Sequence, residues 1–323
     1  MPAPQEAHFG NDLSSNYPDV SVVIPAYNAA KTIGNTIETV LAQTVPAKEI
    51  IVVDDGSADD TAMVAEGYGP FVKVIRKQNG GPASARNLGV RQAAGEWIAL
   101  LDADDLWAPD KLERQLRLVA DPEVGLVHTL TDGQRAQVPT TLSFEQLWDR
   151  NWIVNSTVLL RKKAFENLGG FDETRDLISV EDYNFWLRLA ASGWKILLCP
   201  EPLTQYTRGI GISSDTPRFY KAALCNINLL ADNLSLPKRL VKRRISNIHA
   251  EFGRTALYNR NNLLARELLI RSFINYPSPQ GFLLIGAACL PAYVLDLKRR
   301  ARTLLSIIVS KTPMRSRTLK EFP

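Results

Sequence analysis

The sequence predicts an α/β fold in which a mostly parallel sheet is flanked by helices and followed by a helical C-terminal extension. Short apolar runs alternate with segments of helical periodicity through the first half of the chain, which is typical of a parallel sheet with right-handed crossovers. This alternation ends near Pro217, and the pattern beyond it is helical. The content of 45% hydrophobic and 22% charged residues is that of an ordinary globular protein.

Four short apolar runs in the first half predict buried strands. They span residues 20–24, 49–53, 72–75 and 97–101. The segments between them predict helices. One begins near Ile33, one follows Ser57 as its cap and runs to about Glu66, and one spans 83–93 behind Pro82, which suits a first helical position.

The pattern is less regular after Pro109, but helices and strands can still be assigned. The expected helices span 109–119, 163–168 and 180–191, and the expected strands span 124–130, 156–161 and 195–198. Three parts follow from these assignments. They are a lead-in over 1–17 that we expect to be disordered, an α/β domain over 18–214, and a helical extension over 215–323 that ends in a basic tail.

The cysteine content and the N-terminal residues predict a cytoplasmic protein. Cys199, Cys225 and Cys289 match neither a metal-binding spacing nor a disulfide framework, which fits a reducing compartment. The chain starts with polar residues and not with a basic segment followed by an apolar one, so we expect no secretory signal peptide.

Positive charge is concentrated near the C-terminus. From Lys298 onward, eight Lys or Arg residues accompany one acid, Glu321, so this tail has a net charge of +7. Because the net charge of the whole chain is +4, residues 1–297 have a net charge of −3. A second basic cluster spans 238–244. Neither cluster has interleaved aromatic residues or a nucleic-acid motif, so we expect no nucleic-acid partner. An anionic membrane surface suits such charge better.

The apolar stretch from Phe282 to Leu295 leaves two interpretations open. It is shorter than the roughly 20 residues that span a bilayer, and a basic block follows it at 298–300. It can form a buried helix, or it can lie in the membrane interface with the basic residues on anionic headgroups. The second interpretation predicts a peripheral position on the inner face of the membrane.

A cluster of carboxylates ends the fourth apolar run. Asp102, Asp104 and Asp105 follow it directly, and ligands bind at strand ends in open α/β sheets. The Asp102-x-Asp104 pair suits a hard divalent ion that is held by one or two carboxylates and by substrate phosphates. The alternative is an acidic turn in which Asp102 or Asp105 caps the helix that begins near Pro109.

The loops after the first two runs hold residues that suit a nucleotide base. Pro25 closes the first run, and Tyr27 offers a ring on which a base can stack. In the second loop, Asp55 can accept a hydrogen bond from the N–H of uracil or a similar base. The alternatives are an ordinary turn at the first loop and helix capping by Asp54 or Ser57 at the second.

The third loop contains Gly80 and Gly81 and leads to Arg86. Glycines permit close backbone approach, and a guanidinium one turn into the next helix can bind phosphate oxygens in a bidentate manner. An exposed surface arginine is the alternative. Together the four loops predict a nucleotide-diphosphate site. They lack the Gly-x-Gly-x-x-Gly of dinucleotide sites and the Lys-Ser/Thr of a P-loop, which disfavours a dehydrogenase or an NTPase.

In order and spacing, these loops resemble the motif series of the family 2 inverting glycosyltransferases. The matching segments are 22–28, 52–57, 81–87 and 102–105, and the resemblance covers roughly residues 20–208. It implies the GT-A fold of nucleotide-diphospho-sugar transferases, Mg²⁺ or Mn²⁺ as cofactor, and a nucleotide-diphosphate sugar donor, expected to be UDP-linked. It also implies a saccharide or lipid-linked acceptor in cell-surface polysaccharide biosynthesis.

The resemblance implies roles for single residues in donor binding. Pro25 and Tyr27 would line the base pocket, and Asp55 would hold the base. Arg86 would face the pyrophosphate.

The carboxylates receive the remaining implied roles. Asp102 would contact the ribose or diphosphate, and Asp104 would ligate the metal. Glu181-Asp182 matches the acidic pair at a later helix start, and Asp182 takes the position of the catalytic base. A carboxylate there can remove the proton of the attacking hydroxyl while the metal offsets charge on the departing diphosphate. For Glu181, stabilisation of the helix N-terminus is the alternative.

One departure predicts transfer of a single sugar. Members of the family that polymerise long chains often carry Gln-x-x-Arg-Trp, but the segment 205–209 lacks the Trp, and no run is long enough to span a membrane. Arg208 can still reach the diphosphate. The alternatives are a nucleotidyltransferase, for which 25–28 is not a suitable triphosphate loop, and a non-catalytic saccharide-binding relative, which Asp104 and Asp182 disfavour.

Specificity for the donor sugar and the acceptor is expected to depend on the irregular segment 127–175. The residues in it that can shape the pocket, with core packing as the alternative, are Trp148, Trp152, Asn155 and Phe171.

Overall fold

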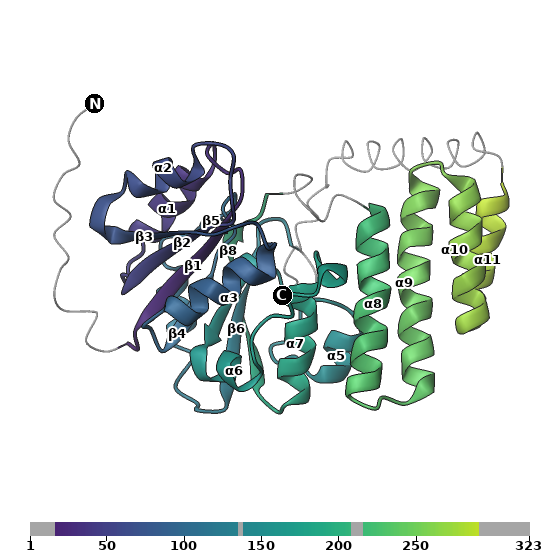
Figure 1. The fold of residues 1–323 in the computed structure, drawn as a ribbon. Coiled ribbons are helices and arrows are strands. Elements are labelled where there is room, and N and C mark those ends of the chain that lie inside the picture. The colour runs from purple at the N-terminus through teal and green to yellow at the C-terminus, as the bar shows by residue number, and fades with distance from the viewer. Residues whose placement is uncertain (1–16, 135–137, 208–215, 291–323) are drawn as a thin grey trace, which may run out of the picture. The chain divides into compact units, whose positions relative to one another are not determined.

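The computed structural model describes residues 17–134, 138–207 and 216–290. The chain forms two compact units, one ending at Leu234 and one beginning at Ser235. Figure 1 shows the elements of each unit. The expected lead-in, except for Tyr17, and the basic tail lie outside the described residues.

The first unit is built on an eight-stranded sheet with the order β3-β2-β1-β4-β7-β6-β8-β5. Neighbouring strands from β3 to β4 are parallel, as are β6 and β8, whereas β7 is antiparallel to both of its neighbours and β5 to β8. The expected α/β fold with a mostly parallel sheet is therefore confirmed. The strands are β1 (Val20–Ala26), β2 (Glu49–Asp54), β3 (Val72–Arg76), β4 (Trp97–Leu100), β5 (Leu106–Trp107), β6 (Val124–Thr131), β7 (Leu159–Arg161) and β8 (Lys195–Gln205).

Helices flank this sheet (Figure 1). The α-helices of the first unit are α1 (Ile33–Leu41), α2 (Thr61–Glu66), α3 (Pro82–Gln92), α4 (Lys111–Leu116), α5 (Phe144–Asp149), α6 (Lys162–Asn167), α7 (Glu181–Ala191) and α8 (Thr216–Asn233). In the described part of this unit, short 3₁₀ turns accompany them: η2 (Gly69–Phe71), η3 (Asn155–Thr157) and η4 (Arg175–Leu177).

The core holds α3 close to the sheet. Apolar residues of α1 and α4 pack with one face of β1, including Val22 and Ile24. Side chains alternate along a strand, so Val23 points to the other face. There a Cβ on Gly89 of α3 would lie only 2.4 Å from Cγ1 of Val23. Glycine thus allows α3 to approach β1 and brings its first turns to the carboxyl edge of the sheet.

Local contacts correct two expected boundaries near that edge. Ser57 does not cap α2, because its hydroxyl oxygen accepts a hydrogen bond from the Asn28 N–H at 2.9 Å, and the N-cap is Asp60. β1 does not stop before Pro25 but continues to Ala26. The carbonyl of Val23 points toward β4, so the backbone nitrogen of Pro25, two residues later, points to the same side. At that position β1 has already passed the last residue of β4 with which it pairs. No ladder N–H is lost there.

Two strands of the second half also differ from expectation. β8 extends to Gln205 although Pro200 and Pro202 lie within it, and register shifts along β6 accommodate the prolines. The expected strand over 156–161 is shorter, because 155–157 forms η3. α5 was not expected, although Ser143 and Gln146 form a capping box at its start.

The boundary between the two units lies after Leu234, later in the chain than the expected boundary after residue 214. α8 belongs to the first unit because Ala222 packs with Leu177 and Val180 in a small apolar cluster.

The second unit contains α9 (Lys238–Tyr258), α10 (Asn262–Asn275) and α11 (Pro279–Cys289). A Cβ on Gly253 would lie 2.9 Å from Leu269, so α9 and α10 pack closely. In α11, Phe282 and Leu283 are exposed while Ala288 is buried, so this part of the apolar stretch is not a wholly buried helix. Across the described ranges, no helix is both long enough and apolar enough to traverse a bilayer.

Candidate active site

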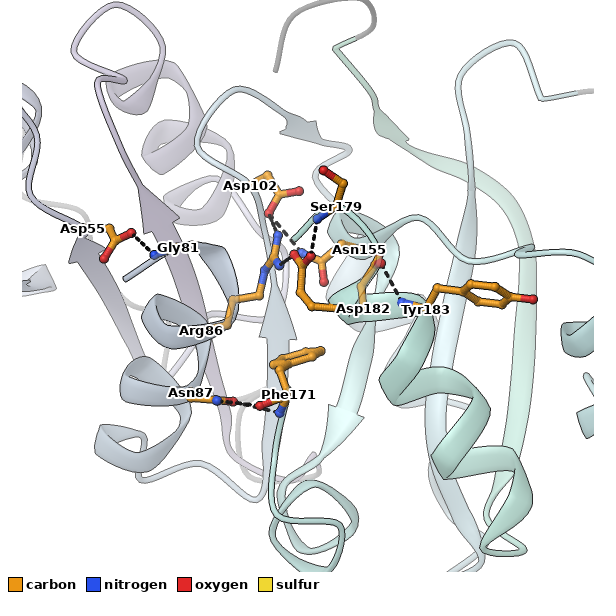
Figure 2. Close-up of polar contacts among 11 residues, drawn as sticks. Asp55, Gly81, Arg86, Asn87, Asp102, Asn155, Phe171, Ser179, Asp182 and Tyr183 are labelled. Atoms are coloured by element: carbon orange, nitrogen blue, oxygen red, sulfur yellow. Dashed lines mark hydrogen bonds and ion pairs between the residues drawn. The ribbon is translucent and has the colours of Figure 1, made fainter. Parts of the chain in front are cut away.

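The predicted residues come from loops at the carboxyl edge of the sheet, and Figure 2 shows Asp55, Arg86, Asp102 and Asp182 among them. β1, β2 and β4 are parallel, so the loops that carry Tyr27, Asp55 and Asp102 all follow strand ends on this edge. α3 contributes Arg86, and the first turn of α7 contributes Asp182. This is the edge at which open α/β sheets bind ligands.

Arg86 lies at the centre of the cluster and is only 6% exposed. Its Nη2 donates to Oδ1 of Asp102 at 2.8 Å, and its Nη1 donates to Oε1 of Glu181 at 2.7 Å. The arginine is therefore not an exposed surface residue. Each Nη keeps a second N–H, so a phosphate contact of the expected kind would add to these ion pairs and would not replace them.

Asn155 completes the surroundings of Asp102. Its amide nitrogen donates to the same Oδ1 of Asp102 at 3.0 Å, and the backbone N–H of Asp102 donates to the Ser156 hydroxyl at 3.0 Å. These contacts fix one carboxylate oxygen of Asp102 within the protein. Oδ1 of Asn155 is buried and has no hydrogen-bond partner within the described part of the chain, so an acceptor is left beside Asp102.

Glu181 and Asp182 differ in their surroundings although they are neighbours. Glu181 is buried, pairs with Arg86 and accepts the Ser179 N–H at 2.8 Å, so it does more than favour the helix N-terminus. Asp182 accepts the Tyr183 N–H at 2.6 Å. Burial, assisted by the charge of Glu181 and opposed by that of Arg86, raises the pKa of Asp182 to about 7.

Asp104 and Asp105 follow the same strand but face different partners. Burial, assisted by the charge of Asp102, raises the pKa of the half-buried Asp104. Asp105 is buried and accepts the Thr207 N–H at 2.8 Å, and burial raises its pKa to about 7. Neither Asp102 nor Asp105 caps α4, because the N-cap of that helix is Asp110.

The carboxylates do not form a ready-made metal cage. Within the ranges that the structure describes, no group of three or more His, Cys, Asp or Glu side chains is arranged to hold a metal ion. Asp102 is engaged by Arg86 and Asn155, whereas the Asp104 carboxylate interacts with its own backbone N–H. A half-buried carboxylate with a raised pKa is a group that a cation would stabilise, so the donor set fits one ion completed by other ligands.

Asp55 is engaged by the glycine loop. Its Oδ1 accepts from Lys77 Nζ at 2.7 Å and from the Gly80 N–H at 2.9 Å, and its Oδ2 accepts from the Gly81 N–H at 2.8 Å. The carboxylate therefore orders the turn that starts α3. Oδ2 retains one acceptor position, which is what a base N–H would need.

The base-stacking candidates lie on the loop after β1. Tyr27 is 55% exposed, so its ring is available to a ligand, and Pro25 is half-buried. Asn28, in the left-handed region with φ 51°, links this loop to the next one, since its Oδ1 accepts the Ala58 N–H at 2.9 Å.

Sequence reasoning missed some residues at this site. Burial raises the pKa of the Tyr206 hydroxyl, and the nearby charges of Asp102, Asp105, Asp182 and Asp104 raise it further, so this phenol borders the carboxylate cluster. Of the four expected pocket residues, Asn155 joins the cluster, while Trp148 is buried in the core and Phe171 lies beneath Arg86, 5.9 Å from its guanidinium carbon. Arg208 lies outside the described residues.

The arrangement of strands and helices around this edge is that of the GT-A fold. The family model described as "Glycosyl transferase family 2" matches residues 21–180. TuaG of Bacillus subtilis, a glycosyltransferase assigned provisionally to teichuronic acid biosynthesis, is 30% identical over 58% of this chain and 79% of its own length. The succinoglycan biosynthesis protein ExoO of Rhizobium meliloti is 50% identical over 31% of this chain and 29% of its own length.

Solved structures support the same fold. The mannosyltransferase PcManGT of Pyrobaculum calidifontis, in complex with GDP-Man and Mn²⁺, has a TM-score of 0.63 at 21% identity and covers 91% of this chain and 84% of its own. TarS 1–349 of S. aureus, in complex with UDP-GlcNAc, has a TM-score of 0.61 at 19% identity and covers 83% and 84%.

This chain belongs to glycosyltransferase family 2. It spans between 28% and 58% of the length of four Rickettsia glycosyltransferases to which it is 32–34% identical.

Proposed function

We propose that the chain transfers a single sugar from a UDP-linked sugar to a saccharide or lipid-linked acceptor, with inversion at the anomeric carbon. The observation that carries the proposal is Asp182. Its half-buried carboxyl group has a pKa of about 7 and lies beside a glutamate that Arg86 links to Asp102. A carboxyl group tuned in this way is typical of a general base.

In the proposed reaction, the acceptor hydroxyl attacks the anomeric carbon from the face opposite the diphosphate. A bond forms between the acceptor oxygen and that carbon while the bond to the diphosphate oxygen breaks. Asp182 takes the hydroxyl proton. Because its pKa lies near neutrality, the carboxylate form needed to accept the proton is available at physiological pH. The proposed donor-binding residues are Pro25, Tyr27, Asp55, Arg86, Asp102 and Asp104.

Asp104 is the proposed ligand for Mg²⁺ or Mn²⁺. Such ions keep waters and substrate phosphates in their coordination sphere, so one or two protein carboxylates suffice. When bound, the ion offsets negative charge on the departing diphosphate. The mannosyltransferase neighbour, whose structure contains Mn²⁺, supports a divalent cation.

Asp104→Asn is expected to remove most of the affinity that Mn²⁺ adds to UDP binding. The amide has no charge to bind the ion, and we expect a loss of about tenfold or more, roughly 1.4 kcal/mol. Isothermal titration calorimetry with UDP, in Mn²⁺ and in EDTA, measures it. Asp110→Asn, a carboxylate paired with Arg114, is the control. Equal affinity of the native protein for UDP in both buffers would exclude the metal assignment.

A screen of nucleotide sugars tests the donor and the stereochemistry. UDP-sugars are expected to be turned over, and NMR of the product should show the anomeric configuration opposite to that of the donor. Neighbours with UDP-GlcNAc and with GDP-Man support a nucleotide sugar without distinguishing the base. Turnover of GDP-sugars alone would contradict the UDP assignment, and retained configuration would contradict inversion.

The acceptor is proposed from the relatives and from the second unit. The names of ExoO and TuaG refer to succinoglycan and teichuronic acid, which supports cell-surface polysaccharide biosynthesis. Residues 235–290 carry nine Lys or Arg against two Asp or Glu, and Phe282 and Leu283 are 69% and 71% exposed. We therefore propose that the protein associates peripherally with the inner face of the membrane, where lipid-linked acceptors are available.

A full chain with Phe282→Ser and Leu283→Ser is expected to bind anionic vesicles more weakly than the native chain. The two side chains supply apolar surface, and each nearby basic residue adds about 1 kcal/mol of attraction that salt screens. Co-sedimentation with phosphatidylglycerol vesicles at low and high salt measures it. Met63→Ser, an exposed apolar residue of the first unit, is the control. Equal sedimentation of all three chains would contradict the proposal.

A further inference from the structure

The segment from Phe171 to Glu181 leads directly to Asp182, and its two ends are held by adjacent residues of α3. Between these ends the chain is irregular except for η4, and residues 173–176 are exposed. Arg86 holds the far end through Glu181. Asn87, the next residue along the helix, holds the near end.

The side-chain amide of Asn87 pairs with the backbone N–H and C=O of Phe171, as a neighbouring strand would. Its Nδ2 donates to the Phe171 carbonyl at 2.8 Å, and its Oδ1 accepts the Phe171 N–H at 2.9 Å (Figure 2). The second N–H of the amide donates to Oε1 of Glu173 at 2.8 Å. Asn87 and Phe171 are both buried, so the two bonds between them are not exchanged for water without cost.

The backbone of this segment is strained at Ser179. Ser179 has φ 89°, a conformation that favours glycine, and its N–H donates to Glu181. Such a conformation costs about 1–3 kcal/mol and persists only where the surroundings over-determine it. Leu177 and Val180 pack on α8, but this packing alone does not fix the end at Phe171. That end is held by the three hydrogen bonds with Asn87, which fix the backbone of Phe171 and the side chain of Glu173, and by packing of the Phe171 ring on Phe165, Phe185 and Trp186.

We propose that Asn87 is a positioning residue that holds the Phe171 end of this segment and thereby fixes the place of Asp182 relative to the carboxyl edge of the sheet. The proposal deepens the proposed function, since it assigns Asn87 to the placement of the proposed base. Asn87 itself contacts neither Asp182 nor the other proposed site residues through any recorded hydrogen bond. It acts through the chain from Phe171 to Glu181.

Misplacement of a catalytic group by about 1 Å can cost on the order of 10²-fold in rate. Asn87→Leu is therefore expected to lower kcat by about 10- to 100-fold while the KM for the donor changes little. Asn87→Asp keeps the oxygen that accepts the Phe171 N–H, but it places a carboxylate oxygen against the Phe171 carbonyl and the Glu173 carboxylate, so it should loosen the segment at least as much.

Two readouts do not depend on activity. The first is hydrogen–deuterium exchange of residues 172–180, which should become faster in Asn87→Leu while β1 and β4 are unchanged. The second is the pKa of Asp182 from carboxyl ¹³C NMR of the native chain, with Asp182→Asn identifying the resonance. The groups around Asp182 are Glu181 on its own helix, Arg86 on α3, Asp102 after β4 and Tyr206 after β8. If the segment loosens, burial falls and the pKa should drop from about 7 toward its ordinary value.

Gln43→Leu is the matched control. Gln43 is also a buried amide that donates two hydrogen bonds to backbone carbonyls, those of Thr39 and Ala108, and accepts one backbone N–H, from Leu112. It lies on the other side of the core from the segment. Its loss should lower stability without changing exchange at 172–180 or the pKa of Asp182.

Unchanged exchange and an unchanged Asp182 pKa in Asn87→Leu would overturn the proposal, as would equal changes in Gln43→Leu. If Asn87→Leu does not fold, Asn87→Asp is judged by the same two measurements. A native chain that turns over no nucleotide sugar would overturn the proposed function alone, because exchange and NMR would still decide the role of Asn87.

Discussion

Asp182→Asn is expected to abolish sugar transfer while it leaves donor binding nearly unchanged. The amide is close in size to the carboxyl and keeps an oxygen for the Tyr183 N–H, but it cannot take a proton from the acceptor. General bases contribute about 10²–10⁴-fold, and the loss should appear in kcat because the base acts on the acceptor. Initial rates with the native donor and calorimetry with UDP measure the two quantities.

The same substitution is expected to stabilise the folded protein at pH 8. Because burial raises the pKa of Asp182 to about 7, the folded chain keeps this proton between about pH 4 and pH 7, where the unfolded chain has released it. The free energy of unfolding therefore falls as pH rises through this window. Asparagine has no proton to lose, so the variant should have a higher Tm than the native chain at pH 8 and a similar Tm at pH 4.

Asp176→Asn is the matched control, since Asp176 is an exposed carboxylate six residues earlier on the segment that leads to α7. It should retain transfer and show no pH-dependent gain in Tm. Loss of donor affinity in Asp182→Asn would identify Asp182 as a binding residue, and retained transfer would exclude it as the base.

The strands next to the proposed nucleotide site can be predicted from sequence because each is a continuous apolar run. Such runs result from burial on both faces of a parallel sheet, as at Ile51, Val52 and Val53 in β2. β8 could not be predicted in full length. Pro200 and Pro202 normally indicate the end of a strand, and they are tolerated here only because the pairing with β6 shifts its register.

The gathering of the proposed site residues at one edge of the sheet was predictable, but their contacts were not. The residues at strand ends can be named from the order of the loops, since parallel strands bring their ends together. The pairing of Arg86 with Glu181 joins residues 95 positions apart. No local pattern encodes this distance, so the arginine was expected to face only the pyrophosphate. Asn87 was missed for a related reason, because an asparagine inside a helix carries no local signal of a partner on a distant loop.

Arg86→Met is expected to destabilise the protein strongly and to impair the base. Methionine can fill the buried space, but it leaves Asp102 and Glu181 without the N–H donors that now lie 2.8 and 2.7 Å away. Removing one partner from buried ion pairs costs about 3–5 kcal/mol. Urea unfolding at pH 7 measures this cost. Arg114→Met, which removes the more exposed pairs to Asp110 and Glu201, should have little effect.

The pH dependence separates a charge effect from a packing effect. Arg86 lowers the pKa of Asp182, so its removal should raise that pKa above about 7 and move the acidic limb of the kcat profile to higher pH. The free energy of unfolding should depend on pH for the same reason. Below the raised pKa, Asp182 carries a proton and adds no charge to the uncompensated carboxylates. The loss of stability of Arg86→Met relative to the native chain should therefore be smaller at pH 5 than at pH 8.

Arg86→Lys retains the charge, but one ammonium lacks the two separate nitrogens that reach both carboxylates, so it should restore the pH profile more fully than the stability. An equal deficit at both pH values would show that Arg86 acts by filling space and not through its charge.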